Sequence, residues 1–213
     1  MRITKFGHSC FLVEEEKARL LVDPGIWSED VSGLKNIDAL FISHEHPDHV
    51  DPDKIKILLQ NNPEMVIYTN AGVGKVLTEN DYKWIECTAG QVIIVKDVTV
   101  ETVGERHAVI YPGFAKGDVM NTGFLFGDKL YYPGDSFTLP NKPVEILALP
   151  VCAPWLKMAE AIDFAKTIKP KLFFPVHDGM LKHLGPFHGA PKALLEPEGI
   201  QMIVPEIGVP FEV

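Results

Sequence analysis

The sequence predicts an α/β fold in which two packed β-sheets carry helices on their outer faces. Three observations favour this fold class. Short runs of β-branched and aromatic residues outnumber the amphipathic helical segments. The helical segments fall into two groups that are separated by a long stretch of expected strands. Helices that bury one apolar face against a sheet are typical of layered α/β domains.

The first expected strands form a meander. They occupy residues 3–6, 11–13 and 19–22, and a further strand follows at 39–42. The charged residues 14–17 lie between the second and third strands and are typical of a hairpin turn. The chain therefore begins with a small antiparallel unit that ends in a buried strand.

The first helix is expected directly after Asp51-Pro52, because this pair suits an N-cap and the first helical turn. Ile55, Leu58 and Leu59 follow at the i, i+3, i+4 spacing of one apolar helix face. This helix can cover one face of a sheet.

The later elements alternate between strands and helices. Further strands are expected at residues 65–69, 92–95, 98–103, 122–126, 129–132, 144–149 and 171–176, and two short strands close the chain. Gly127-Asp128 is a two-residue hairpin signal. Further helices are expected at residues 73–78, at 191–195, and around Met158, Ile162, Ala165 and Ile168, where the helix ends before Pro170.

Length and composition are those of one folded domain. The 213 residues are 46% hydrophobic and 23% charged, with a mean hydropathy of +0.06. This balance is typical of a globular protein and excludes intrinsic disorder. Since no Ser/Gly linker or low-complexity run interrupts the chain, we expect a single domain over residues 1–213.

The net charge of −9 argues against nucleic acid and anionic membrane surfaces as partners, because both attract Lys and Arg. No window approaches the roughly 18 apolar residues that cross a bilayer. The N-terminus lacks a signal-peptide pattern, and the three cysteines form no CxxC pair. We therefore expect a cytoplasmic protein with a small-molecule substrate, and a homo-oligomer remains open.

The segment 43–49, with the sequence SHEHPDH, is the main functional signal. Three of the eight histidines of the chain, His44, His46 and His49, lie here beside Asp48. The segment follows an expected buried strand and precedes a helix, where a loop is held rigidly. Close imidazoles repel each other once protonated and gain most by sharing a cation. The pattern therefore indicates metal ligands rather than solvated loop histidines.

Three more ligand-type residues each follow an expected strand: His107, Asp135 and His177. Alone, each is weak evidence, because single histidines after strands are commonly structural and an Asp after Pro-Gly is commonly a turn residue. If the strands run suitably, their ends converge on one rim of the sheets. Beside the cluster at 43–49, these residues become candidate ligands.

These residues resemble the metallo-β-lactamase superfamily across essentially the whole chain. The similarity is greatest to the branch that contains the ascorbate-phosphate lactonases and many uncharacterised metal-dependent hydrolases. The matching motifs are HxHxDH at residues 44–49, His107, Gly134-Asp135-Ser136, Pro175-Val176-His177, Gly7-His8-Ser9 and Leu21-Val22-Asp23-Pro24. This resemblance implies a four-layer αββα sandwich. It says little about substrate, because the superfamily spans many reactions.

The resemblance also implies a ligand set. One metal would be held by His44, His46 and His107, and the other by Asp48, His49 and His177, with Asp135 as the bridge. Nitrogen and oxygen donors suit two divalent ions, with zinc first and manganese or iron as alternatives. Two cations roughly 3.5–4 Å apart can share a hydroxide that attacks an ester, lactone or phosphoester. In this hypothesis Asp48, His49 and Asp135 are also the catalytic residues, and Asp48 can orient the water.

Four other residues are candidates for orienting ligands or contacting substrate. Asp23 could hold a ligand histidine or serve as a turn residue, and His8 could support the site, touch substrate or cap a turn. His183 and His188 could protonate a leaving group, although solvated loop histidines are more common. For Trp155, core packing is favoured over a place in the pocket.

Other functions stay open at this point. The alternatives are a nuclease or phosphodiesterase of the same fold, a mononuclear-iron oxidation enzyme, and an inactive metal-binding scaffold. The acidic charge disfavours the nuclease, and the full set of seven candidate ligands disfavours the scaffold. Arg106, Lys116 and Lys182 could pair with an anionic substrate group, but no recognition motif identifies a substrate.

Overall fold

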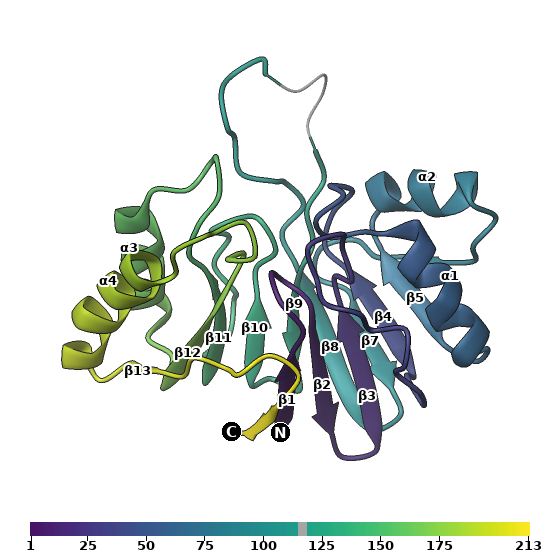
Figure 1. Cartoon of the computed structure of the whole chain (residues 1–213), viewed down its shortest axis with the longest axis horizontal. Coiled ribbons are helices and arrows are strands. Elements are labelled where there is room, and N and C mark those ends of the chain that lie inside the picture. Colours follow the sequence, from purple (N-terminus) through teal and green to yellow (C-terminus); the bar gives the residue numbers. More distant parts are fainter. Residues whose placement is uncertain (115–118) are drawn as a thin grey trace.

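The structure is a computed structural model that describes residues 1–114 and 119–213. Within these residues, two seven-stranded sheets pack face to face and helices cover both outer faces (Figure 1). The layers run helix, sheet, sheet, helix. The predicted α/β sandwich is confirmed, with the αββα order that the family resemblance implied.

The first sheet is antiparallel on one side and parallel on the other. Its strand order is β14-β1-β2-β3-β4-β5-β6. The bounds are β1 Arg2–Lys5, β2 Phe11–Glu15, β3 Ala18–Val22, β4 Ala39–Ile42, β5 Val66–Thr69, β6 Ile85–Glu86 and β14 Pro210–Glu212. The strands from β3 to β6 are parallel, so that β3, β4 and β5 all end at one edge of the sheet.

The second sheet has the order β13-β12-β11-β10-β9-β8-β7. The bounds are β7 Val92–Val95, β8 Val98–Val103, β9 Gly123–Phe126, β10 Leu130–Tyr132, β11 Ile146–Pro150, β12 Leu172–Val176 and β13 Gln201–Met202. β9 is antiparallel to both β8 and β10, and β10, β11 and β12 are parallel. β8, β10, β11 and β12 therefore point the same way.

Aromatic rings fill the space between the sheets. Phe11, Phe41, Phe124, Tyr132 and Phe174 are fully buried in the central core cluster. Phe11 meets both Tyr132 and Phe174 edge-on, and these contacts join one sheet to the other. This rigid centre holds the strand ends of both sheets in a fixed relation.

Two helices cover each outer face. The bounds are α1 Pro52–Asn61, α2 Ala71–Glu79, α3 Met158–Ile168 and α4 Gly185–Leu195, with a short 3₁₀ turn η1 at Glu196–Glu198. α1 and α2 pack on the first sheet, and α3 and α4 pack on the second (Figure 1). Asp51 caps α1 by accepting hydrogen bonds from the backbone N–H groups of Asp53 and Lys54, as its position before Pro52 predicted.

The structure departs from the expected elements at two places. α4 begins at Gly185, not at Pro191, so a proline lies inside the helix. The glycines and prolines of this segment disfavour a helix locally, but packing against the core buries Pro191 and Leu195. β6 was not expected, because its two residues are exposed and follow no alternating pattern.

Among the described residues, no helix is both long and apolar enough to cross a bilayer.

Candidate metal centre

Loops at one rim of the two sheets carry all the candidate ligands. The segment 43–49 follows β4 of the first sheet, whereas His107, Asp135 and His177 follow β8, β10 and β12 of the second. These strand ends meet because the sheets face each other and the strands concerned run in compatible directions. Seven side chains from four segments of the sequence thus come together at one rim, as expected if the strand ends converge.

One donor group consists of His44, His46 and His107, whose ligand atoms lie within 4.8 Å of one another. His44 Nε2 is 3.1 Å from His46 Nδ1, and the rings of His46 and His107 meet edge-on with centroids 4.8 Å apart. Three imidazole nitrogens this close together can serve as ligands of one cation.

A second donor group consists of Asp48, His49 and His177, with His8 beside them. Asp48 Oδ2 lies 3.6 Å from His49 Nε2 and 3.5 Å from His177 Nε2. These distances are too long for hydrogen bonds but suit ligands that surround one ion. The two donor groups match the division that the family resemblance implied.

Asp135 lies between the two donor groups. Its Oδ2 atom is 2.9 Å from His177 Nε2, 3.4 Å from His107 Nε2 and 4.0 Å from His44 Nε2, while Oδ1 is 3.4 Å from His49 Nε2. The carboxylate is 3% exposed and so has little contact with solvent. This placement fits the bridging role expected for Asp135, which remains a prediction.

Hydrogen bonds outside the cluster fix the orientation of two of the rings. His49 Nδ1 lies 2.7 Å from a carboxylate oxygen of Asp23, and His107 Nδ1 lies 2.6 Å from the carbonyl oxygen of Ala108. Both partners can only accept, so Nδ1 carries a proton in each ring, and Nε2 presents a lone pair to the centre when the ring is neutral.

The same logic applies to two more rings. His177 Nδ1 lies 2.5 Å from the carbonyl oxygen of Cys152, so it donates there. Ser43 Oγ donates to Asp23 Oδ2 at 2.5 Å, which leaves its lone pairs to accept from His44 Nδ1 at 3.0 Å. Four histidines therefore direct Nε2 inward, where it offers a lone pair when the ring is neutral.

Asp23 is a central supporting residue and not merely a turn residue. It is fully buried, and its carboxylate accepts from the Ser43 backbone N–H at 2.8 Å and from the Tyr132 hydroxyl at 2.6 Å, besides its bond to His49. Burial raises the pKa of the Tyr132 hydroxyl well above its ordinary value, so this group stays a donor. Of the two alternatives for Asp23, the structure favours the orienting role.

His8 is oriented in the opposite sense. Its Nδ1 accepts from the backbone N–H of Gly179 at 3.1 Å, and its Nε2 lies 3.0 Å from Asp48 Oδ2. A nitrogen that accepts from an N–H cannot carry a proton, so the proton of the neutral ring is on Nε2 and is donated to Asp48. His8 therefore holds Asp48 in place and has no lone pair for a metal.

Three residues at this rim have strained backbone conformations. His8, Asp23 and His177 have φ angles of 46°, 40° and 60°, in the left-handed region that few residues other than glycine adopt. Such conformations cost on the order of 1–3 kcal/mol each and persist where surrounding structure holds them. Here the left-handed turn places each side chain beside the cluster.

The other candidates lie farther from the centre. His183 is exposed and belongs to neither donor group. His188 Nε2 lies 3.0 Å from Asp178 Oδ2, and the buried Lys5 donates to the other oxygen of that carboxylate at 2.6 Å. This buried network adjoins His177 in sequence, and a proton-transfer role for His183 or His188 remains a prediction.

Trp155 was expected to pack in the core, and its 9% exposure agrees. Its indole N–H also donates to Asp135 Oδ2 at 2.9 Å, a contact that the sequence did not indicate. Tyr132, Ala108 and Cys152 were missed as well. Ala108 and Cys152 act through backbone carbonyl oxygens, which no sequence motif marks. For Tyr132, the one signal that could have found it is its position three residues before Asp135.

The protonation of the cluster reflects burial and neighbouring charge. Burial would lower the pKa of His49, but the carboxylates of Asp135 and Asp23 raise it to about 9. Burial lowers the pKa of His44 well below its ordinary value. Burial opposes ionisation of Asp48, yet its hydrogen bond from His8 and the nearby imidazoles lower its pKa to about 2. The metal-free centre thus combines a neutral His44, a His49 that is protonated at neutral pH, and an ionised Asp48.

The donor set fits divalent metal ions. Nε2 of His49, Nε2 of His107 and Oδ1 of Asp135 are buried and have no hydrogen-bond partner among the described residues. Buried polar atoms without a partner are costly, and a cation that accepts their lone pairs removes that cost. The N/O chemistry suits zinc, manganese or iron equally, so it identifies no single metal.

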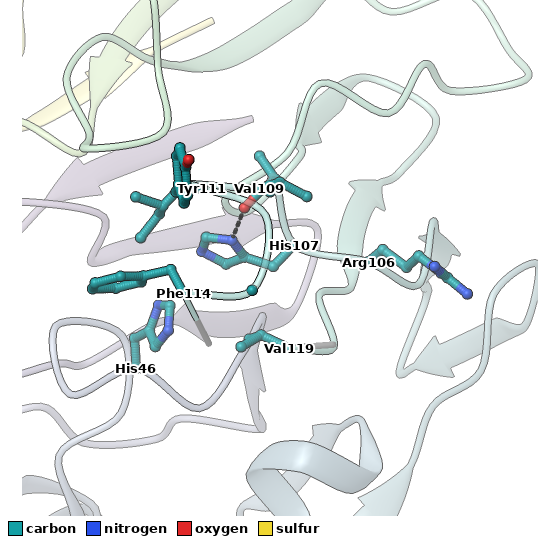
Figure 2. Close-up of a pocket in the computed structure, with 10 residues that line it drawn as sticks. His46, Arg106, His107, Val109, Tyr111, Phe114 and Val119 are labelled. Carbon is teal, nitrogen blue, oxygen red and sulfur yellow. Dashed lines mark hydrogen bonds between the residues drawn. The ribbon is translucent and has the colours of Figure 1, made fainter. Parts of the chain in front are cut away.

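A cavity of about 350 Å³ opens beside the first donor group. His46 and His107 line it, together with most residues of the segment 108–114 and Val119 (Figure 2). Arg106 also borders it, but its guanidinium points away from the histidines in Figure 2. Lys116, one of the cations considered for substrate binding, lies outside the described residues.

Residues 2–177 match the beta-lactamase superfamily domain. The chain belongs to this superfamily. It is 36% identical to Protein Rv0786c of Mycobacterium tuberculosis over 85% of each chain. It is 25% identical to a UPF0173 metal-dependent hydrolase of Thermoplasma acidophilum, covering 100% of this chain and 99% of that one.

Solved structures share the fold. Igni18, a metallo hydrolase from the archaeon Ignicoccus hospitalis, superposes with a TM-score of 0.75 at 20% identity, covering 100% of this chain and 98% of that chain. These similarities confirm the metallo-β-lactamase fold and the metal-dependent hydrolase branch that the motifs indicated.

Proposed function

We propose that this chain is a binuclear metal-dependent hydrolase that cleaves an ester, lactone or phosphoester of a small molecule. The observation that carries the proposal is the convergence of buried N and O donors whose free electron pairs face one centre. His44, His46 and His107 would hold one divalent ion, and Asp48, His49 and His177 the other. Asp135 would contact both.

When bound, such ions supply hydroxide at neutral pH and polarise the oxygen of the bond to be cleaved. The residues of the chain provide the geometry. Asp23, Ala108 and Cys152 hold His49, His107 and His177 with Nε2 inward. His8 holds Asp48, and Trp155 holds Asp135. Rigid support of this kind keeps ligands in one arrangement and tunes the metal.

The chain needs no side-chain nucleophile for this reaction. No Ser or Cys is required where water is activated by metal. The curated relatives named metal-dependent hydrolases support the assignment of the reaction class. The acidic net charge of −9 supports a small molecule over nucleic acid as substrate.

The test is metal content per chain by elemental analysis, on protein purified without chelator, together with hydrolysis of generic lactone and phosphodiester substrates. Close to two equivalents of zinc, manganese or iron, with turnover that a chelator abolishes, is the expected result. One iron per chain with oxygen consumption and no hydrolysis would instead indicate an oxidation enzyme. Full metal occupancy without hydrolysis across a broad substrate survey would contradict the proposal.

A further inference from the structure

The cavity beside His46 and His107 has apolar walls that face solvent. Val109, Tyr111 and Phe114 are 70%, 72% and 71% exposed, although each is apolar or aromatic. Single exposed apolar residues are ordinary, but these lie together on one segment that projects from the sheets (Figure 1). Such a concentration is typical of a binding site.

The position of the cavity links these residues to the candidate metal centre. His46 and His107, two of the proposed ligands, line the same space as Val109, Tyr111 and Phe114 (Figure 2). A molecule whose reactive bond reached the metals would therefore lay its adjoining part against the apolar wall. The volume of about 350 Å³ lies within the range of small-molecule sites, roughly 300–1,000 Å³.

The part of the cavity wall that the structure describes is poor in charged side chains. Among the described residues that line it, Arg106 is the charged side chain, and it points away from the histidines (Figure 2). Phosphate recognition ordinarily uses Arg, Lys or several backbone N–H groups directed at the oxygens. The described wall instead offers aliphatic and aromatic carbon.

We propose that this cavity binds an uncharged, apolar arm of the substrate, so that the chain hydrolyses a carboxylic ester or lactone with an aliphatic or aromatic substituent in preference to a phosphoester. The inference rests on the proposed function, because it assumes that bond cleavage occurs at the metal centre. It adds the substrate class, and it assigns Val109, Tyr111 and Phe114 to specificity.

The first experiment measures binding without metal or turnover. Nile red, a neutral apolar dye, is titrated into wild-type protein, Val109→Asp and Ile94→Asp. Ile94 is a matched control, because it is 68% exposed, β-branched and outside the cavity lining. We expect Val109→Asp to weaken dye binding about tenfold or more, since a carboxylate in an apolar wall is costly to desolvate. Equal affinities for the two variants would overturn the inference.

The second experiment uses alkyl hydroxamates of two to eight carbons, whose head group binds metal, with zinc-loaded protein and calorimetry. Affinity should rise about two- to fourfold per added methylene until the cavity is filled. The trend should flatten in Val109→Asp and persist in Ile94→Asp. A flat trend in wild-type protein would overturn the inference.

These measurements separate the two proposals. A rising hydroxamate trend in a protein that hydrolyses no ester, lactone or phosphoester would contradict the proposed function but support the apolar site. Faster cleavage of bis(4-nitrophenyl) phosphate than of every 4-nitrophenyl acyl ester would contradict the ester preference. If no hydroxamate binds, the proposed metal centre is contradicted, and the dye comparison alone tests the apolar cavity.

The oligomeric state is measured by light scattering. A dimer that Val109→Asp dissociates would assign the wall to an interface between copies and overturn the inference.

Discussion

Five of the six rings of the cluster have one nitrogen occupied by a hydrogen bond to a group outside it, and the identity of that partner decides what the other nitrogen can do. His49, His107 and His177 donate from Nδ1 to acceptors, so their Nε2 atoms are free to bind a cation. His8 accepts from a backbone N–H, so its Nε2 must donate. Proximity alone groups His8 with the ligands, and the hydrogen bonds separate it from them.

Removing one donor should affect one metal or both, depending on its place. His46→Ala should lose most of one metal equivalent and abolish hydrolysis, because His46 belongs to a single donor group. Asp135→Ala should lose both, since its carboxylate approaches histidines of both groups. Elemental analysis of the two variants in parallel measures this. Loss of only one equivalent in Asp135→Ala would make Asp135 a terminal ligand.

Substitution of His8 should weaken the second metal site without removing a ligand. His8→Ala deprives Asp48 of its donor, and loss of such a supporting bond typically costs about 10–100-fold in metal affinity or activity. The visible spectrum of the cobalt-substituted protein should keep its shape in His8→Ala and change in His177→Ala. His8→Gln, which retains an N–H donor, should recover part of the affinity.

A His8→Ala spectrum altered as strongly as that of His177→Ala would make His8 a ligand and contradict its assignment as a positioning residue.

At the scale of elements, the ligand loop after β4 is packed against the turn that follows β3. A Cβ added at Gly25 would lie 1.9 Å from the carbonyl oxygen of Asp48 and 2.4 Å from the His49 backbone nitrogen. The backbone N–H of Ile26 also donates to the Pro47 carbonyl at 2.8 Å. Contact of backbone with backbone leaves this loop no room to relax, so the turn helps to place Asp48 and His49.

Gly25→Ala should therefore displace the ligand loop. Overpacking of this kind costs typically 1–3 kcal/mol of unfolding free energy, and the movement of Asp48 should also lower metal affinity. Gly33→Ala is the matched control, because nothing lies within 4 Å of its added Cβ. Denaturant unfolding and metal titration of both variants check the prediction. Equal stability and affinity for the two would show that the loop adapts.

At the scale of the whole molecule, the candidate metal centre joins the two sheets. His44, His46, Asp48 and His49 come from the first sheet, and His107, Asp135 and His177 come from the second. Metal binding should therefore stabilise the sandwich as a unit. At a free metal concentration 100 times the dissociation constant, one site contributes about 2.7 kcal/mol to unfolding free energy.

This stabilisation should grow with pH. His49 has a pKa raised to about 9 in the metal-free centre, so at pH 7 it is protonated and must release its proton to become a ligand. The charged His49 stabilises the metal-free fold below its ordinary pKa of 6.5, and this contribution is lost as pH rises through 9. Both effects enlarge the difference in unfolding free energy between metal-bound and metal-free protein as pH increases.

Thermal unfolding with zinc and with chelator, at pH 6.5 and 8.5, measures the difference directly. We expect a larger rise in Tm on zinc addition at the higher pH. Calorimetry in buffers of different ionisation enthalpy should detect the released proton at pH 7. A stabilisation that does not change with pH would contradict a protonated His49 in the metal-free protein.

The sequence by itself determined the fold class, the superfamily and the residues that are candidate metal ligands. Periodicity revealed most elements, because strands such as β4 and β8 carry dense runs of apolar or β-branched residues. The HxHxDH spacing marked the centre because three imidazoles and a carboxylate within six residues have few other uses. Only residues 191–195 of helix α4 were predicted as helical, since the glycines and prolines of its first half oppose a helix that tertiary packing enforces.

Only the tertiary structure decided how those side chains are oriented and supported. Asp23, Tyr132 and Trp155 contact the ligands across sequence separations of 20 to 83 residues. The backbone carbonyls of Ala108 and Cys152 serve equally and leave no mark in the sequence. The proton on His8 is likewise assigned by the backbone N–H of Gly179, 171 positions away. A hydrogen bond depends on where two atoms meet in space, and sequence spacing reports that only within one local segment.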